Sequence, residues 1–395
     1  MDQFQSFPGR VSAALSEASG VRSPADKDVS ASGERVATNK AALSLVSGRL
    51  LLTSSSQTVP GAWKDAIDQL AQALEIDVDW VADDQPPSLI QKARRVVGSD
   101  VASQAPIYSP WRIISPTALQ MGQAGDGVTG AHWVASYLFD FGRACALQHG
   151  PVDIALMSPC PKFCVSDDAQ VGSLPRLSVL AKMMRAAASE GRTNLAVVVQ
   201  ESARATIAAR LLSFDASLKD ISLDVEFISI EEAVGDIQRG TFDWDAVIAM
   251  PDLRGILFAM LAQSSGVAGP WPMLWFGRGL RLITCEALQG ARLSSHLDAT
   301  ALIQTLALLA RHSGHQYAAG RLYESWAALR GNGVVTAARS SSAPYVNEID
   351  EAAFIERACL KSSQNACSLP NWMGVARGDD RGRTTSQPVH LTLVE

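Results

Sequence analysis

The chain has 395 residues and a formal net charge of −6, with 47% hydrophobic and 19% charged residues. This size and apolar content are enough to bury a large core, and the length favours two domains over one. The acidic balance and the lack of a dense Lys/Arg stripe argue against a nucleic-acid partner. The longest apolar runs, such as residues 196–199, have the length of a strand, so we expect no membrane-spanning segment and no membrane partner.

The two ends of the chain differ from the rest in composition. Residues 1–45 are rich in Ser, Ala and small polar residues, which bury too little apolar surface to offset the entropy of ordering, so a disordered leader is expected. Residues 363–395 are expected to form a similarly loose tail, in which 390–394 have the pattern of an edge strand. A Ser-rich leader would also suit the export signal of a bacterial effector, and this alternative stays open.

The cysteines indicate neither a disulfide framework nor a zinc site. Six cysteines are too few for a disulfide-stabilised chain of this length. Cys160 and Cys164 lie close together in the segment CPKFC, but they lack the two-residue spacing of zinc sites, and no Cys or His group complements them. We therefore expect no metal site there, and a reduced cytoplasmic protein.

The first half of the ordered region begins with a strand–helix–strand unit. A short apolar run at residues 49–53 precedes a helix at 63–74, whose apolar side chains recur on one face. Residues 76–80 then alternate as a half-buried strand does. The elements predicted next are strand ends at 105–110 and 111–116, a helix at 132–147 and a buried strand at 151–159.

The second half alternates strands and helices, which predicts an α/β fold. The predicted strands are residues 194–200, 223–230, 242–251 and the short 333–338. The predicted helices are residues 174–191, 203–212, 230–240, one directly after 251, then 297–314, 316–333 and 350–362. Glycines at 191 and 240 are expected to end two of these helices.

This order of elements resembles the isocitrate/isopropylmalate dehydrogenase family of β-decarboxylating dehydrogenases, over residues 46–362. The resemblance implies a two-domain α/β fold with a central cleft. The first, cofactor-side domain would comprise residues 46–130 and 265–362, and the second, residues 131–264, would be inserted between them. It also implies the cofactors NAD(P) and Mg²⁺, a small carboxylate ligand, and a homodimer or a heteromer with an intact dehydrogenase subunit.

The metal-binding motif of the family is missing from the matching segment. The family places two aspartates one turn apart in a G-D-x-x-x-D pattern, where this chain has Arg254 and Gly255 followed by Ile, Leu, Phe and Ala. Mg²⁺ needs several hard oxygen ligands, and a neighbouring arginine repels it. Asp252 survives nearby, and we predict that it caps the helix that follows rather than binding a metal.

The residues that the family uses for the substrate and for proton transfer are also absent. Ser136 and Ala146 stand where substrate-binding arginines are expected, and Arg143, the one arginine of that segment, is out of register. Gln200 and Glu201 stand where a catalytic lysine should follow a strand. The strand at 151–159 runs into a Ser-Pro-Cys sequence with no tyrosine near it.

The cofactor loop and the dimer arm depart from the family as well. The segment EALQGARLSSHLD is shorter than the family's adenosine loop, and SSSQTVPG lacks the glycine spacing of the first loop. The remaining cofactor-binding candidates are Glu286, Gly290, Arg292 and His296. Too few residues separate the strand at 151–159 from the helix at 174–191 for the family's subunit-interlocking arm, so we expect it to be trimmed or absent.

Four hypotheses follow from these departures. The chain is a pseudoenzyme that acts by binding or as a partner subunit, or a repurposed enzyme that acts on a small carboxylic acid in the cleft. It could instead be an active NAD(P)-dependent, decarboxylating 2-hydroxy-acid dehydrogenase, or a secreted effector. The candidate catalytic residues are Asp252, Arg254, Glu201, Arg143 and His132.

Overall fold

The computed structural model describes residues 49–55, 61–83, 106–116, 131–140, 152–165, 174–213, 223–265, 269–277, 280–288, 296–339 and 346–362. The predicted leader and tail, and the candidates Arg143, Gly290 and Arg292, lie outside these ranges. Within them, no helix is long and apolar enough to cross a membrane.

An eight-stranded mixed sheet forms the centre of the described region. In spatial order its strands are β3 (Ile107–Ile114), β12 (Leu280–Glu286), β11 (Trp271–Gly277), β4 (Ala131–Asp140), β5 (Val152–Pro159), β10 (Ala246–Ala249), β8 (Asn194–Val199) and β9 (Asp224–Ser229). Strands β5, β10, β8 and β9 run parallel to one another, whereas β4 is antiparallel to both of its neighbours. The α/β class predicted from the sequence is confirmed.

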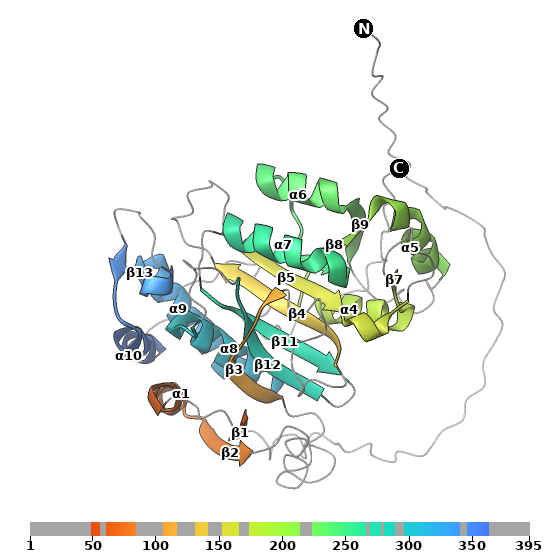
Figure 1. The fold of residues 1–395 in the computed structure, drawn as a ribbon. Coiled ribbons are helices and arrows are strands. Elements are labelled where there is room, and N and C mark those ends of the chain that lie inside the picture. The colour runs from red at the N-terminus through yellow and green to blue at the C-terminus, as the bar shows by residue number, and fades with distance from the viewer. Residues whose placement is uncertain are drawn as a thin grey trace, which may run out of the picture.

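Helices cover both faces of this sheet. The α-helices after β7 (Leu174–Pro175) in the chain are α4 (Leu177–Ser189), α5 (Glu201–Ser213), α6 (Ile230–Arg239), α7 (Pro251–Ser264), α8 (Ala299–His312), α9 (Gln316–Gly331) and α10 (Glu351–Ser362), of which α10 packs against α9. Helices α6 and α7 lie on one side of the sheet, and α8 and α9 lie on the other (Figure 1). Helix α8 is buried along nearly its whole length, as expected of a helix that is apolar all round.

Local sequence signals define several helix ends. Ser229 and Glu232 form a reciprocal capping box at the start of α6, and Gly240 ends that helix in the left-handed conformation, with φ 63°. Gly191, with φ 76°, follows α4. Both predicted glycine stops are confirmed. Asp298 caps α8 by accepting a hydrogen bond from the amide nitrogen of Ala301 at 2.6 Å.

Three two-stranded pairings accompany the main sheet. Strands β1 (Arg49–Ser55) and β2 (Asp77–Asp83) are parallel, with α1 (Gly61–Ala73) between them in the chain, which confirms the predicted strand–helix–strand unit. Strands β13 (Val334–Val335) and β14 (Asn347–Glu348) are also parallel. Strands β6 (Cys164–Val165) and β7 (Leu174–Pro175) form a short antiparallel pair in the segment where the dimer arm was expected to be trimmed.

The central strands owe their apolar sequences to burial on both faces. All residues of β10 are buried, and in β8 only Asn194 is not. Such strands appear in the sequence as continuous apolar runs rather than as alternating patterns. The main hydrophobic core lies on both sides of these strands and extends into α4, α7, α8 and α9.

The predicted helix at 132–147 is wrong, because residues 131–140 form strand β4. Nine of its ten residues are buried, so its apolar run carries no period that distinguishes a strand from a buried helix. Trp133, Tyr137 and Phe139 are residues that favour strands. The strand ends at Asp140, whose carboxylate accepts two hydrogen bonds from Arg330 at 2.9 and 3.0 Å. Strands β11 and β12 are additional to the predicted elements.

The main sheet continues across the predicted domain border. Strands β3, β11 and β12 come from the predicted first domain, and the other five come from the second. Strand β4 joins the two sets, because it pairs with β11 on one side and with β5 on the other. The division into two domains therefore stays a prediction.

Candidate functional site

Polar side chains gather where three neighbouring strands end. Strands β5, β10 and β8 are parallel, so their carboxyl ends meet at one edge of the sheet, the place where α/β proteins bind ligands. The chain turns there into the short 3₁₀ helix η1 (Pro161–Phe163), into α7 and into α5. We call Cys160, Cys164, Gln200 and Asp252 the carboxyl-edge cluster.

Asp252 lies in the first turn of α7 but does not cap it. Pro251 begins the helix, and Met250 occupies the capping position without a side-chain hydrogen bond. The predicted capping role of Asp252 is therefore wrong, because a proline in the first helical position moves the aspartate inside the helix. Oδ2 of Asp252 accepts a hydrogen bond from Nε2 of Gln200 at 3.0 Å, while its Oδ1 is buried and has no hydrogen-bond partner.

Arg254, two residues further along α7, belongs to a closed network in the core. Its Nη2 donates to Oε2 of Glu286 at 2.6 Å and to Oγ of Ser136 at 2.8 Å, and its Nη1 donates to Oε1 of Glu286. Ser136 also donates to the Glu286 carboxylate. All three residues are almost completely buried, so this bidentate pair joins α7, β12 and β4 in a region without solvent.

This network changes the interpretation of Glu286, a predicted cofactor-binding candidate, and of Ser136. Both carboxylate oxygens of Glu286 are engaged and the residue has no exposed surface, which argues against a contact between Glu286 and a cofactor. Ser136, at a position where the resemblance places a substrate arginine, holds the ion pair instead. No local sequence signal marks this pairing, because 32 residues separate Arg254 from Glu286.

The other described candidates do not join the carboxyl-edge cluster. Glu201 is exposed in the first turn of α5 and contacts Arg204 at 3.4 Å. His296 is exposed ahead of α8. His132, near the start of β4, packs its ring against Phe163 with the ring centroids 4.4 Å apart. His132 therefore lies beside the turn that contains the two cysteines.

The two cysteines experience different charges. Burial raises the pKa of the Cys160 thiol to about 11, while the positive charges of Arg254 and Lys162 oppose that rise. Burial raises the pKa of the Cys164 thiol to about 12, and the negative charge of Asp252 adds to it. Among the described residues, no group of three or more His, Cys, Asp or Glu side chains could hold a metal ion.

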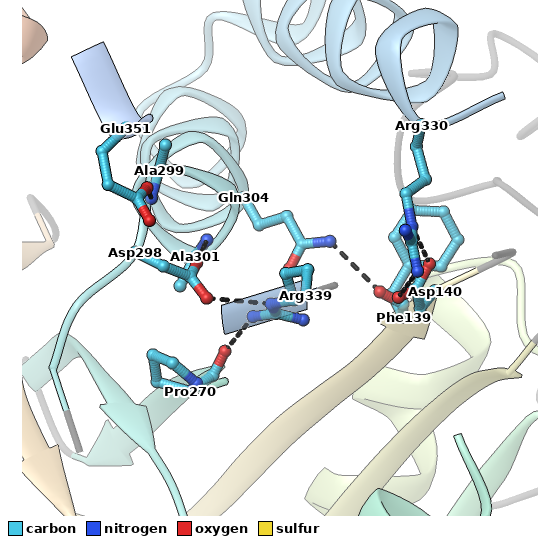
Figure 2. A network of polar contacts seen from close by, with 10 residues as sticks. All are labelled: Phe139, Asp140, Pro270, Asp298, Ala299, Ala301, Gln304, Arg330, Arg339 and Glu351. Carbon is cyan, nitrogen blue, oxygen red and sulfur yellow. Dashed lines mark hydrogen bonds and ion pairs between the residues drawn. The ribbon is translucent and has the colours of Figure 1, made fainter. Parts of the chain in front are cut away.

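A second polar network lies at the start of α8 (Figure 2). Nε of Arg339, in the 3₁₀ helix η3 (Ala337–Arg339), donates to Oδ2 of Asp298 at 2.9 Å, and Arg339 also donates to the carbonyl of Pro270. The guanidinium lies 4.8 Å from the centroid of the Trp271 ring. Glu351 accepts a hydrogen bond from the amide nitrogen of Ala299. These contacts fasten β11, α8, η3 and α10 together, while Nη1 of Arg339 stays buried without a hydrogen-bond partner.

The geometry defines an α/β protein with a mixed sheet and a polar cluster at the carboxyl ends of its parallel strands. Its structure is similar to the crystal structure of isocitrate dehydrogenase from Methylococcus capsulatus, with a TM-score of 0.52 and 13% identity over 80% of this chain and 100% of that chain. It is also similar to the TT0538 protein from Thermus thermophilus, with a TM-score of 0.53 and 11% identity over 87% of this chain and 72% of that chain. No protein-family model matches the sequence, and no curated protein matches it either. The chain therefore has an isocitrate dehydrogenase-like fold with a strongly diverged sequence.

Proposed function

We propose that this chain is a pseudoenzyme with an isocitrate dehydrogenase-like fold, which acts by binding and does not catalyse metal-dependent oxidative decarboxylation. The observation that supports this most directly is the pairing of Arg254 with Glu286. On the helix where the resemblance expects two metal-binding aspartates, the polar side chain next to Asp252 is a cation, and it is locked to a carboxylate inside the protein.

The described residues at this edge are unsuited to a divalent metal. Mg²⁺ prefers near-octahedral oxygen coordination, with one or two carboxylates as its protein ligands. In α7 only Asp252 offers a carboxylate, and its Oδ2 already accepts a hydrogen bond from Gln200. The positive charge of Arg254 on the same helix raises the electrostatic cost of placing a dication there.

Proton transfer by the family's route is also unsupported. Gln200 follows β8 where the resemblance expects a lysine, and an amide side chain does not titrate. The Gln200 amide instead joins the beginnings of α5 and α7 through Asp252. This contact positions two helices and supplies no proton donor or acceptor of suitable pKa.

A binding role keeps the fold without the family's chemistry. The resemblance implies a small carboxylic acid as ligand and a homodimer, or a heteromer with an intact dehydrogenase subunit, as the assembly. We carry both into this proposal, together with a cytoplasmic location. The alternative is a repurposed enzyme, in which the same edge of the sheet performs different chemistry.

A thermal-shift experiment tests the proposal. The protein is melted with NAD⁺ or NADP⁺, with Mg²⁺ or Mn²⁺, and with isocitrate or isopropylmalate, singly and together, beside an active isocitrate dehydrogenase as control. A ligand at a hundred times its Kd stabilises the native state by about 2.7 kcal/mol, which raises Tm by several degrees. We expect no such rise with any pair of cofactor and metal. A rise of several degrees with cofactor and metal, accompanied by formation of reduced cofactor, would contradict the proposal, whereas a rise with an acid alone would support the proposed carboxylic acid ligand.

A further inference from the structure

His132 and Cys160 face each other across two antiparallel strands. The pairing of β4 with β5 reaches Trp133 opposite Pro159. The amide nitrogen of Cys160 donates to the carbonyl of His132 at 2.9 Å, so the pairing continues by one residue. Residues directly opposite in an antiparallel pair point to the same face, with their Cβ atoms about 4.5–5.5 Å apart. The backbone register therefore directs the thiol and the imidazole toward the same face of the sheet.

An irregularity in β4 sets His132 apart from its neighbours. On the β11 side, Phe276 pairs with Trp133 and Gly277 pairs with Ala131, so His132 is the extra residue of a β-bulge. Bulges redirect a side chain and occur often beside active sites. The ring of His132 lies against Phe163, in the turn that begins directly after Cys160. The imidazole is therefore held over the cysteine-containing turn.

The charges around Cys160 favour a negatively charged group. Arg254 and Lys162 both oppose the effect of burial on the Cys160 pKa. Arg254 is 1% exposed, and its Nε has no hydrogen-bond partner although its other two nitrogens are engaged. Cys164 is the internal contrast, because the charge that acts on it is the carboxylate of Asp252.

We infer that Cys160 is a nucleophile activated by His132, and that it forms covalent bonds with small carbon electrophiles, preferably anionic ones. The sulfur attacks the electrophilic carbon, an S–C bond forms, and the leaving group departs with its electron pair. The thiol proton passes to the imidazole, which acts as the general base. Burial raises the pKa of the Cys160 thiol to about 11, so the thiol is protonated at neutral pH and a base must accept its proton as the S–C bond forms.

This inference goes beyond the proposed function and is independent of it. It involves neither a metal nor a nicotinamide cofactor, so a failure of one proposal leaves the other standing.

Alkylation of the full chain by iodoacetate and iodoacetamide tests the inference, with the labelled cysteines resolved by peptide mass spectrometry. Cys164 is the matched control, because it lies in the same turn and is also partly buried. We expect Cys160 to react at least about tenfold faster than Cys164 at pH 7, because the imidazole accepts the thiol proton. The ratio of iodoacetate to iodoacetamide labelling should be higher at Cys160 than at Cys164.

The variant His132→Gln separates base catalysis from simple exposure. It should slow the labelling of Cys160 about tenfold or more at pH 7, while labelling of Cys164 stays unchanged. If the wild-type Cys160 reacts no faster than Cys164 at pH 7, the inference is wrong. That measurement needs no variant, so it decides the matter even if His132→Gln fails to fold.

Discussion

Arg254 and Glu286 form a fully buried bidentate ion pair, with Nη2 of the arginine 2.6 Å from Oε2 of the glutamate. Removing one partner of such a pair leaves an unpaired charge in the core, which costs about 3–5 kcal/mol. We therefore expect Arg254→Met to lower the free energy of unfolding by about this amount in urea denaturation. The double variant Arg254→Met with Glu286→Leu should recover most of the loss, because apolar replacement of a buried pair is often neutral. A double variant as unstable as the single one would show that the charge is not the cause.

We expect loss of the Gln200–Asp252 hydrogen bond at the carboxyl edge to lower stability less than loss of the Arg254–Glu286 pair does. Gln200→Leu removes the donor and leaves the partly buried carboxylate of Asp252, whose Oδ1 already lacks a partner, without this bond. The expected loss is about 1–3 kcal/mol in the free energy of unfolding. Glu201→Gln, one residue further along and exposed, is the matched control and should change stability by less than about 0.5 kcal/mol. Equal effects at both positions would contradict the structural role of Gln200.

His312 predicts a loss of stability in acid. Burial, with the charges of Arg281 and Arg311, lowers the pKa of His312 to about 3. As pH falls below 6.5, His312 gains a proton in the unfolded chain but stays neutral in the folded protein. The contribution of neutral His312 to the free energy of unfolding is therefore fully present above pH 6.5 and is lost as pH falls toward 3. At pH 4.5 the loss relative to pH 7 is on the order of 2–3 kcal/mol.

The variant His312→Phe isolates this contribution. It keeps an aromatic ring beside Phe276, whose centroid lies 6.0 Å from that of His312, and it does not titrate. Urea denaturation at pH 7 and 4.5 should show a smaller acid loss in the variant than in the wild type. If the variant loses as much stability between pH 7 and pH 4.5 as the wild type does, other groups cause that loss.

Gly269 predicts a steric effect on the Asp298–Arg339 pair. A Cβ at this position would lie 2.3 Å from Oδ2 of Asp298 and 2.7 Å from Nε of Arg339. Gly269→Ala should therefore separate the pair and lower stability by about 1–3 kcal/mol, as overpacking of a core does. At Gly331 an added Cβ meets nothing within 4 Å, so Gly331→Ala should be neutral or slightly stabilising. Thermal melts of the two variants and the wild type measure both effects. Similar changes in Tm for both variants would exclude the steric explanation.

The sequence predicts most of the fold because local patterns mark most of its elements. The continuous apolar runs of β8 and β10 and the glycine stops at 191 and 240 identify elements without tertiary information. The pattern fails at β4, where burial on both faces removes the period. It also misplaces the start of α7, because Pro251 and not Asp252 opens the helix.

The candidate site is harder to predict because its contacts join distant residues. His132 and Cys160 are both conspicuous in the sequence, but a helix at 132–147 would place them on different elements with no defined relation. Only the strand assignment and its register bring them opposite each other. Likewise, no local feature pairs Arg254 with Glu286, since each residue alone resembles an ordinary position in a helix or a loop.

The network of Arg254, Glu286 and Ser136 has a consequence for motion. Its residues come from α7, β12 and β4, so its hydrogen bonds cross from one predicted domain to the other. Opening the two halves about a hinge would strand a charge in the core, and that cost opposes the domain closure by which many two-domain proteins surround a ligand. We expect the two halves of the sheet to move as one body and any ligand to enter through the loops at the carboxyl edge.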